Sequence, residues 1–494
     1  MNASLVLAQT LLTLAVEGDG PVRFGFPLEE RMLARGLSVE GCPGARVQWR
    51  PLQPRKDPAT GRVWVELAIA PARGTLRVCA GARGSERGSV CDTAADTAEE
   101  DAATVTIRRW RWWEGSVDET TRRTWRLEQA LADGEVMHAG ESWTEPGPGH
   151  DERWLRVRIA RAEWERAGIL PRDQGLARAL RGELARIAGA LQELPGRRGA
   201  GDYGRSGGIV TNLEFDTILG LARLGLAQED RALLARALRG ARHLRDIDLD
   251  SATGLPFCHG PDHRTAPPEP GHAWLSGLLL VGCLAADDEL IAAARGIARG
   301  LAFRPGGGEG RRDRARDLGW PLLELETWLA FADDVVLARA ANAQAAALLA
   351  RHDPVAAVVR FGEGERRGGL YEERCWITGG ILLPALRAVR RRGEQRGVDD
   401  VLASLSLAHL RRIESGREGL PLRVLLDGRK PVEELRIGGA PELALLLEGI
   451  APDSLPGTLQ RAGVRRALVG LLREDDPDLA TSWSKVARCS WVLR

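Results

Sequence analysis

The chain has 494 residues, of which 44% are apolar, and its formal net charge at pH 7 is +1. This length exceeds what one hydrophobic core usually supports, so we expect two or more domains. The nearly balanced charge gives no general attraction to nucleic acid or to an anionic membrane, and neither is expected as a partner. No internal segment approaches the roughly 20 consecutive apolar residues of a membrane span, so we expect a soluble protein.

The first residues, MNASLVLAQTLLTLAVEGDG, contain an apolar stretch as long as that of a signal peptide, but they lack a basic start and a small-residue cleavage site. The same stretch is typical of a first β-strand, and the compartment stays open. The seven cysteines are an odd number, widely spaced and without a CxxC pair, which argues against a zinc ribbon and a dense disulfide framework. A bridge between Cys79 and Cys91 is left open, and no cofactor is expected.

Residues 1–170 have the pattern of an all-β domain. Their segments are short, rich in β-branched residues and tryptophan, and separated by Gly, Pro and Asp turns. Strands are expected at 48–52, 62–69, 74–79, 103–110 and 154–159. Together they predict a β-barrel or a sandwich.

Residues 171–494 show helical spacing of apolar residues, beginning at 174–194. Trp274, Trp320 and Trp376 each stand at the start of an expected helix. A second helix then follows a capping acid, at Asp287–Asp288, Asp333–Asp334 and Asp399–Asp400, and at Asp230 in the preceding hairpin. About a dozen helices in hairpins predict an α/α toroid or a helical solenoid. We favour the toroid because the loops before the inner helices are long and polar.

Long loops on one rim of such a fold form a site. The first loop, GDYGRSGGIVTNLEFD, supplies Tyr203, Arg205, Asn212, Glu214 and Asp216, and a later loop, GEGERRGGLYEERCW, supplies Tyr371, Glu372 and Glu373. Both tyrosines of the chain precede inner helices, which indicates a role in the site. The alternative is that each tyrosine anchors its loop through a buried ring and a hydrogen-bonded hydroxyl.

Histidine is concentrated between these two loops. Four of the eight histidines lie in one Gly/Pro-rich stretch: His243, His259, His263 and His272. Because histidine titrates near neutral pH, this stretch is the strongest indication of chemistry. His272 opens an expected helix, whose dipole would keep the imidazole neutral and able to accept a proton. Since a glycine and a proline separate His259 from His263 and no HExxH motif occurs, no metal site is expected.

Several motifs together resemble a known family. They are VEGDGPVRFGFPLEERMLARGL and PRKDPATGRVWVELAI in the first part, and GDYG, NLEFD, ARHLRDID, HGPDH and GHAWLSGLLL in the second. With them the chain resembles the exo-rhamnogalacturonan lyase-like family over roughly residues 15 to 300, HGPDH and GHAW being the most specific elements. The resemblance implies a RIFT-type β-barrel at 1–170, an α/α toroid at 171–494, and a carbohydrate-active enzyme that cleaves acidic, pectin-type glycan by β-elimination.

β-Elimination across C4 and C5 of a uronate needs a group that neutralises the carboxylate, a base for the C5 proton and an acid for the departing oxygen. Arg205 or Asn212 fits the first task. His259, His263 or His272 fits the second, and Tyr203 or another histidine fits the third. Further contacts with an acidic oligo- or polysaccharide are expected from Trp274, as a stacking wall, and from Glu214, Asp216, Asp262, Tyr371 and Glu372.

Two other functions stay open. A glycoside hydrolase on the same fold would use a pair of carboxylates drawn from Glu214, Asp216, Asp262, Glu372 and Glu373. It would release a saturated sugar, whereas a lyase releases an unsaturated one. A non-catalytic glycan-binding or scaffold protein would bind the sugar without turning it over.

Overall fold

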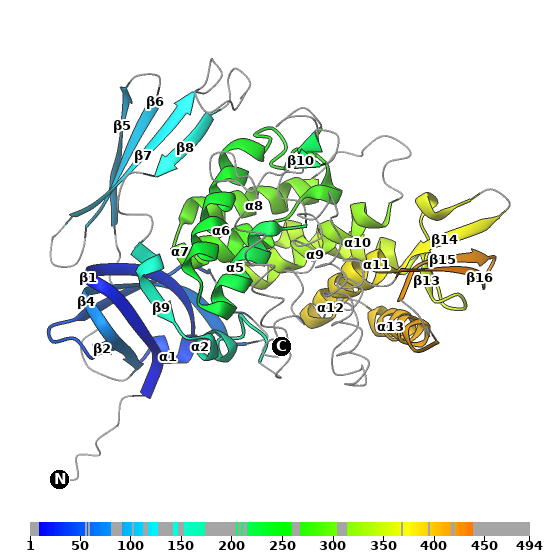
Figure 1. The fold of residues 1–494 in the computed structure, drawn as a ribbon, viewed down its shortest axis with the longest axis horizontal. Coiled ribbons are helices and arrows are strands. Elements are labelled where there is room, and N and C mark those ends of the chain that lie inside the picture. The colour runs from blue at the N-terminus through cyan, green and yellow to red at the C-terminus, as the bar shows by residue number, and fades with distance from the viewer. Residues whose placement is uncertain are drawn as a thin grey trace, which may run out of the picture.

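The computed structural model describes residues 9–54, 57, 60–80, 91–100, 103–111, 117–126, 142–146, 153–172, 204–205, 209–210, 215–258, 267–303, 314–366, 369–393, 396–415 and 420–437. Over these residues the protein is a mixed structure of sheets and helices (Figure 1). Two antiparallel sheets come from the N-terminal part, and an array of helices follows them. No helix in these ranges is both long and apolar enough to cross a membrane.

The first sheet is built around two long strands, β1 (Gln9–Glu29) and β4 (Arg62–Ala80), which pair antiparallel along almost their whole length. β9 (Val157–Ile159) pairs with the other edge of β1, and β4 also pairs with β2 (Leu37–Glu40) and β3 (Arg46–Pro51). Parts of the long strands bury every second residue, as expected when one face of a sheet covers a core, whereas residues 24–28 and 65–69 are buried without a break. The buried residues include Leu12, Leu14, Val16, Val63, Val65 and Leu67.

The strands expected from the sequence are largely found in this sheet. The first strand is β1, and the two segments expected at 62–69 and 74–79 are parts of the single strand β4. The prediction at 154–159 is only half right, because residues Arg153–Arg156 form a 3₁₀ turn, η1. Trp154 and Leu155 of this turn are both buried.

The second sheet contains β5 (Cys91–Glu100), β6 (Ala103–Arg111), β7 (Val117–Arg126) and β8 (Ser142–Pro146), paired antiparallel in chain order. The described pairings keep the two sheets separate. The β-rich character of the first part is therefore confirmed, while a RIFT-type barrel stays a prediction. Cys79 is a buried free thiol, so the bridge to Cys91 that the sequence left open does not form.

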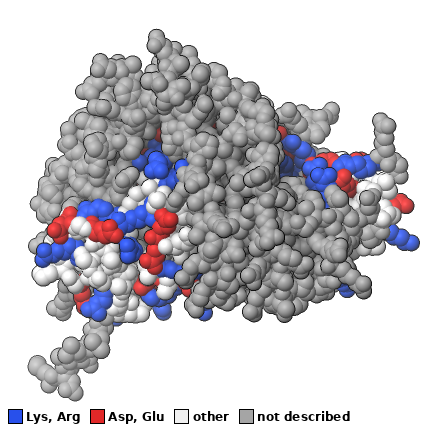
Figure 2. Space-filling model, in the orientation of Figure 1, with Lys and Arg blue, Asp and Glu red and all other residues white. Residues whose placement is uncertain are grey.

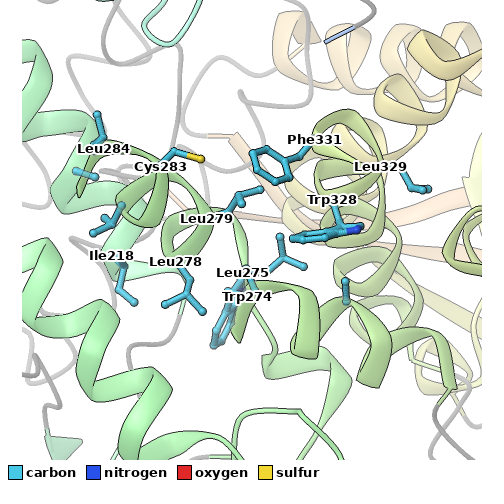
Figure 3. Packing of buried hydrophobic residues seen from close by; sticks show 14 of the residues in the cluster. Ile218, Trp274, Leu275, Leu278, Leu279, Cys283, Leu284, Trp328, Leu329 and Phe331 are labelled. Carbon is cyan, nitrogen blue, oxygen red and sulfur yellow. The ribbon is translucent and has the colours of Figure 1, made fainter. Parts of the chain in front are cut away.

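The helices are arranged as antiparallel hairpins. The described pairs are α5 (Thr217–Gln228) with α6 (Arg231–His243), α7 (Ser276–Ala285) with α8 (Asp288–Phe303), α9 (Ala315–Phe331) with α10 (Val335–Leu349), and α12 (Leu383–Arg392) with α13 (Val398–Ser415). The first helices of successive pairs contact one another. Figure 3 shows Leu278 and Leu279 of α7 between Ile218 of α5 and Trp328 of α9. Closure of this array into a toroid stays a prediction, and the helix expected at 174–194 lies outside the described residues.

Aspartate side chains begin the second helices of three pairs, as expected. Asp230 caps α6, Asp287 caps α8 and Asp334 caps α10, each accepting backbone N–H groups of the first turn. The prediction is wrong in detail for Asp399–Asp400, because α13 already begins at Val398. Asp399 instead lies in the first turn and pairs with Arg390, 3.0 Å away.

The C-terminal half also contains strands that the helical pattern did not predict. A three-stranded sheet consists of β14 (Leu370–Arg374), β15 (Leu420–Asp427) and β16 (Lys430–Ile437), and a short pair of β12 (His352–Asp353) and β13 (Val358–Val359) precedes it. The β15–β16 hairpin turns at Gly428 and Arg429, between the paired residues Asp427 and Lys430, and Gly428 has φ +57°. Asp-Gly between two apolar runs is a hairpin signal, so this sheet could have been found from the sequence.

The first sheet packs directly on the C-terminal end of α7. A Cβ atom on Gly25 of β1 would lie 1.7 Å from the carbonyl oxygen of Cys283, so only glycine fits at this contact. Buried Glu66 of β4 pairs with Arg23 and Arg50, and Arg50 reaches Asp288 of α8 at 2.8 Å. On the face seen in Figure 2, the described surface carries acidic and basic side chains side by side.

Candidate functional site

The segments that lead into the inner helices meet at one end of the array. The ring centroid of Phe215, which precedes α5, lies 6.2 Å from Trp274, 6.2 Å from Trp320 and 6.5 Å from Trp376. Trp274 precedes α7, Trp320 lies in α9, and Trp376 lies in the short helix α11 (Cys375–Ile377). We call these four residues the aromatic cluster. Trp376 is half-buried, whereas the other three rings are buried.

The backbone that presents Phe215 is strained. Phe215 and Asp216 have φ values of 60° and 55°, and left-handed conformations cost non-glycine residues about 1–3 kcal/mol each. The buried Asp216 carboxylate holds this conformation, since it accepts the N–H of Leu219 at 3.1 Å and that of Gly277 at 2.9 Å. One oxygen of Asp216 thus caps α5 and the other binds α7, and the expected contact of Asp216 with substrate stays a prediction.

His272 lies beside this cluster and is 4% exposed. It ends a 3₁₀ turn, η4 (Pro270–His272), and α7 begins only at Ser276, so the expected position at a helix N-terminus is wrong. A carboxylate takes the place of the helix dipole: Nδ1 of His272 lies 2.8 Å from Oε2 of Glu269. This contact places a proton on Nδ1 and leaves Nε2 as the nitrogen that can exchange a proton with a ligand.

Cys258 completes a small group with this pair. Its sulfur lies 3.3 Å from Oε2 of Glu269 and 3.5 Å from Nδ1 of His272. The thiol and the carboxylate therefore approach the same ring nitrogen, so the three residues do not form a nucleophile–base–acid relay, in which the two partners contact opposite nitrogens. Thiol, carboxylate and imidazole are also close enough to hold a metal ion together.

Arg314 joins Glu269 to a second carboxylate. Its guanidinium donates to Oε1 of Glu269 at 2.6 Å and to Asp317 at 2.8 Å. The hydrogen bond from His272 lowers the pKa of Glu269 far below its usual 4.5, Arg314 adds to this, and burial opposes it. Burial raises the pKa of Asp317, against the effect of Arg314. Two carboxylates on one guanidinium thus differ in their tendency to be protonated.

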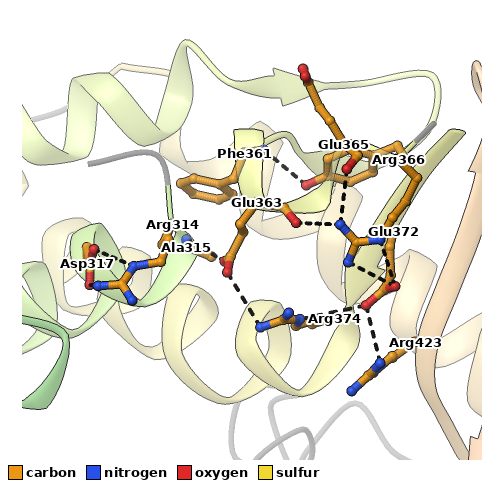
Figure 4. Close-up of polar contacts among 11 residues, drawn as sticks. Arg314, Ala315, Asp317, Phe361, Glu363, Glu365, Arg366, Glu372, Arg374 and Arg423 are labelled. Carbon is orange, nitrogen blue, oxygen red and sulfur yellow. Dashed lines mark hydrogen bonds and ion pairs between the residues drawn. The ribbon is translucent and has the colours of Figure 1, made fainter. Parts of the chain in front are cut away.

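A network of ion pairs continues from the start of α9, as Figure 4 shows. Glu363 accepts the N–H of Ala315 at 2.9 Å and pairs with Arg374 at 3.5 Å. Glu372, expected to bind substrate, is surrounded by guanidinium groups, at 3.0 Å from Arg366, 3.5 Å from Arg423 and 3.7 Å from Arg374.

Tyr371 fits the alternative of a loop anchor. Its hydroxyl donates to the carbonyl of Val359 at 3.0 Å and accepts the N–H of Phe361 at 3.0 Å. The ring is buried, and Arg360 lies 5.0 Å from its centroid. Burial raises the pKa of Tyr371 to about 12.

The structure brings His272, Trp274 and Asp216 together, and it places Tyr371 and Glu372 in the neighbouring ion-pair network. Arg205 lies in the short strand β10 (Gly204–Arg205), paired with β11 (Ile209–Val210), and its side chain is not described. The other expected site residues lie outside the described ranges: Tyr203, Asn212, Glu214, His259, Asp262 and His263. Their roles stay predictions.

Sequence reasoning missed Cys258, Glu269, Arg314 and Asp317. Glu269 stands three residues before His272, and Cys258 directly precedes His259, so both could have been noticed in the same loop. Arg314 and Asp317 belong to a distant segment, RRDRARD, whose charges gave no sign of a buried partner.

An open cleft of about 660 Å³ runs along the inner helices and is lined on one side by the first sheet. Its lining includes four arginines: Arg62, Arg223, Arg387 and Arg391. His272, Glu269 and Arg314 are not among its lining residues. The candidate site is defined instead by the chemistry of its residues, as the aromatic cluster together with the His272–Glu269 pair.

The sequence matches no protein-family model and none of the curated proteins. Solved structures give distant likenesses. A sugar epimerase from a ruminal bacterium is 11% identical, with a TM-score of 0.46 over 60% of this chain and 87% of that one. A polysaccharide lyase is 12% identical, with a TM-score of 0.44 over 63% and 97%. The cellobiose 2-epimerase of Bacillus thermoamylovorans is 11% identical, with a TM-score of 0.43 over 61% and 88%.

Proposed function

We propose that this chain is a carbohydrate-active enzyme and that it cleaves a uronate-containing, pectin-type glycan by β-elimination. The observation that carries the proposal is the His272–Glu269 pair, 2.8 Å apart, beside the buried ring of Trp274. A carboxylate on Nδ1 orients the imidazole and stabilises the imidazolium that forms when Nε2 accepts a proton. Of the motifs that carry the family resemblance, HGPDH (259–263) precedes this pair and GHAW (271–274) contains His272.

In the proposed step, His272 removes the proton from C5 of the uronate. The C–H electron pair forms the C4–C5 double bond, the C4–O bond breaks, and the departing oxygen takes a proton from an acid. Tyr203, His259 and His263 are the candidates for that acid, and Arg205 or Asn212 would neutralise the substrate carboxylate. Within the aromatic cluster, the half-buried ring of Trp376 is the one with surface for a sugar contact.

The test is incubation of the purified protein with a panel of uronate-containing oligosaccharides, followed by ultraviolet absorbance and product mass. We expect an unsaturated product from the wild-type protein. We expect roughly a 10²-fold or greater loss of rate in His272→Ala and a smaller loss in Glu269→Gln, because the latter keeps the imidazole but not its charged partner. His352→Ala is the matched control. His352 is not part of the candidate site, and its ring hydrogen-bonds Ser404.

Full activity in His272→Ala would contradict the proposed base. Binding of the sugars without any new product would show a glycan-binding protein that is not an enzyme.

Glycoside hydrolysis is the second candidate. It is favoured by the opposite pKa shifts of Glu269 and Asp317, since a hydrolase needs one carboxylate ionised and another held toward its protonated form. This reaction predicts a saturated product of unchanged absorbance. Asp317→Asn would then abolish turnover, whereas the elimination at His272 does not require Asp317 as an acid.

A further inference from the structure

A second group of metal-ligating side chains lies at the start of α11 and is distinct in its residues from the His272 pair. Glu373 is on β14, Cys375 opens α11, and His409 is on α13. Their ligand atoms all lie within 4.8 Å of one another. Three elements from two parts of the sequence therefore converge on one point.

Burial separates this group from ordinary surface clusters of ionisable residues. Cys375 and His409 are 0% exposed, and Glu373 is 2% exposed. A carboxylate is costly to bury unless its charge is compensated, and ionisable groups deep in proteins are therefore paired or coordinate metals. A divalent cation would compensate both a carboxylate and a thiolate at this position.

We propose that Glu373, Cys375 and His409 form a zinc site. One sulfur, one nitrogen and one oxygen ligand suit zinc, whereas calcium and magnesium prefer oxygen ligands alone. Zinc–ligand bonds of about 2.0–2.3 Å place tetrahedral ligand atoms roughly 3.3–3.6 Å apart, so ligand atoms that lie within 4.8 Å of one another would approach by at most roughly 1.2–1.5 Å. Three protein ligands leave the fourth position for another donor.

The site would fasten the C-terminal sheet to the helices. β15 contacts both α11 and α13, and its Val424, opposite Glu373 in the sheet register, is fully buried. Cys375 is followed by Trp376 of the aromatic cluster. A bound ion would thus also fix the half-buried ring of that cluster, without taking part in the proposed reaction.

The test measures the zinc content of the full-length protein. The protein is first stripped of metal with a chelator, then reloaded with zinc and dialysed. We expect about one zinc per chain in the wild type, and zinc affinity lower by about tenfold or more in Cys375→Ser and His409→Asn. Cys258→Ser is the matched control, because it removes the thiol of the other metal-capable group, and it should keep its zinc.

Cobalt(II) supplies a second readout that needs no variant to fold. The cobalt-loaded wild-type protein should show a thiolate-to-cobalt charge-transfer band, and this band should persist in Cys258→Ser. Wild-type protein that retains no zinc and gives no cobalt band would overturn the proposal. So would zinc that is lost in Cys258→Ser and kept in Cys375→Ser. The first result leaves the proposed elimination untouched, because that reaction is measured by product absorbance. The second result would instead place the zinc at the group that contains His272.

Discussion

At the scale of single residues, two backbone groups hold the Tyr371 hydroxyl in a buried position. The pH at which this hydroxyl ionises therefore tests whether Tyr371 anchors its loop. Folding favours the neutral phenol, because burial raises the pKa from 10 to about 12. The resulting stabilisation is complete below pH 10 and is lost as the pH rises through about 12. Since the chain has two tyrosines, Tyr203→Phe leaves Tyr371 as the sole phenolate chromophore. We expect its absorbance titration to have a midpoint near 12.

The control is Tyr371→Phe with Tyr203 retained. This variant leaves the N–H of Phe361 and the carbonyl of Val359 without the hydroxyl, which should cost about 1–3 kcal/mol in urea unfolding. A midpoint near 10 in protein that circular dichroism shows to be folded would contradict the loop-anchor role.

The residues of the candidate site could be predicted only in part from the sequence. His272 and Trp274 were identified because their residue types are chemically distinctive and their loop is rich in histidine. The partner of His272 was misjudged, because a helix dipole was expected where the chain makes a 3₁₀ turn and supplies Glu269. Arg314 could not be anticipated, since 45 residues separate it from Glu269 and only packing of η4 on α9 joins them.

At the scale of helices and strands, a helix cap can be predicted from the sequence when it is local but not when it comes from a distant helix. Asp334 caps α10 from the adjacent residue, a contact that its position in the sequence predicted. The start of α7 is instead capped from α9: buried Glu324 accepts the N–H of Leu275, the N–H of Ser276 and the hydroxyl of Ser276 at 2.6–3.1 Å. No local pattern indicates such a contact, because the two residues of the cap lie 48 positions apart.

This difference predicts two unequal losses of stability. Asp334→Ala should cost about 1 kcal/mol, the usual value for an exposed N-cap. Glu324→Ala should cost roughly 2–4 kcal/mol, because it leaves three donors at a buried helix start without their acceptor. Urea unfolding of the two variants measures both values. Equal losses would show that α7 does not depend on its remote cap.

At the scale of the whole molecule, the contact between Gly25 and Cys283 sets how closely the first sheet approaches the helices. Gly25→Ala would place a methyl group 1.7 Å from a carbonyl oxygen, so the sheet and α7 must separate. We expect a loss of at least about 3 kcal/mol, within the range of severe packing changes. Thermal and urea unfolding provide the measurement.

Gly296→Ala is the matched control for this substitution. Gly296 lies inside α8, and a Cβ atom there has no neighbour within 4 Å. Alanine is the better helix former, so this variant should gain roughly 0.5–1 kcal/mol. A Gly25→Ala protein as stable as Gly296→Ala would mean that the sheet is not packed on α7 as described.

Local signals in the sequence were enough to predict three features: the strands β1 and β4, the helical hairpins, and the aspartate caps of α6, α8 and α10. These follow from periodicity and from hydrogen bonds between near neighbours. The contacts between distant polar groups are instead set by the folded chain. They are Glu269 with Arg314, Glu324 with the start of α7, and Glu373 and Cys375 with His409. Such contacts join segments that are distant in the chain, and burial makes each of them depend on a partner that no local pattern specifies.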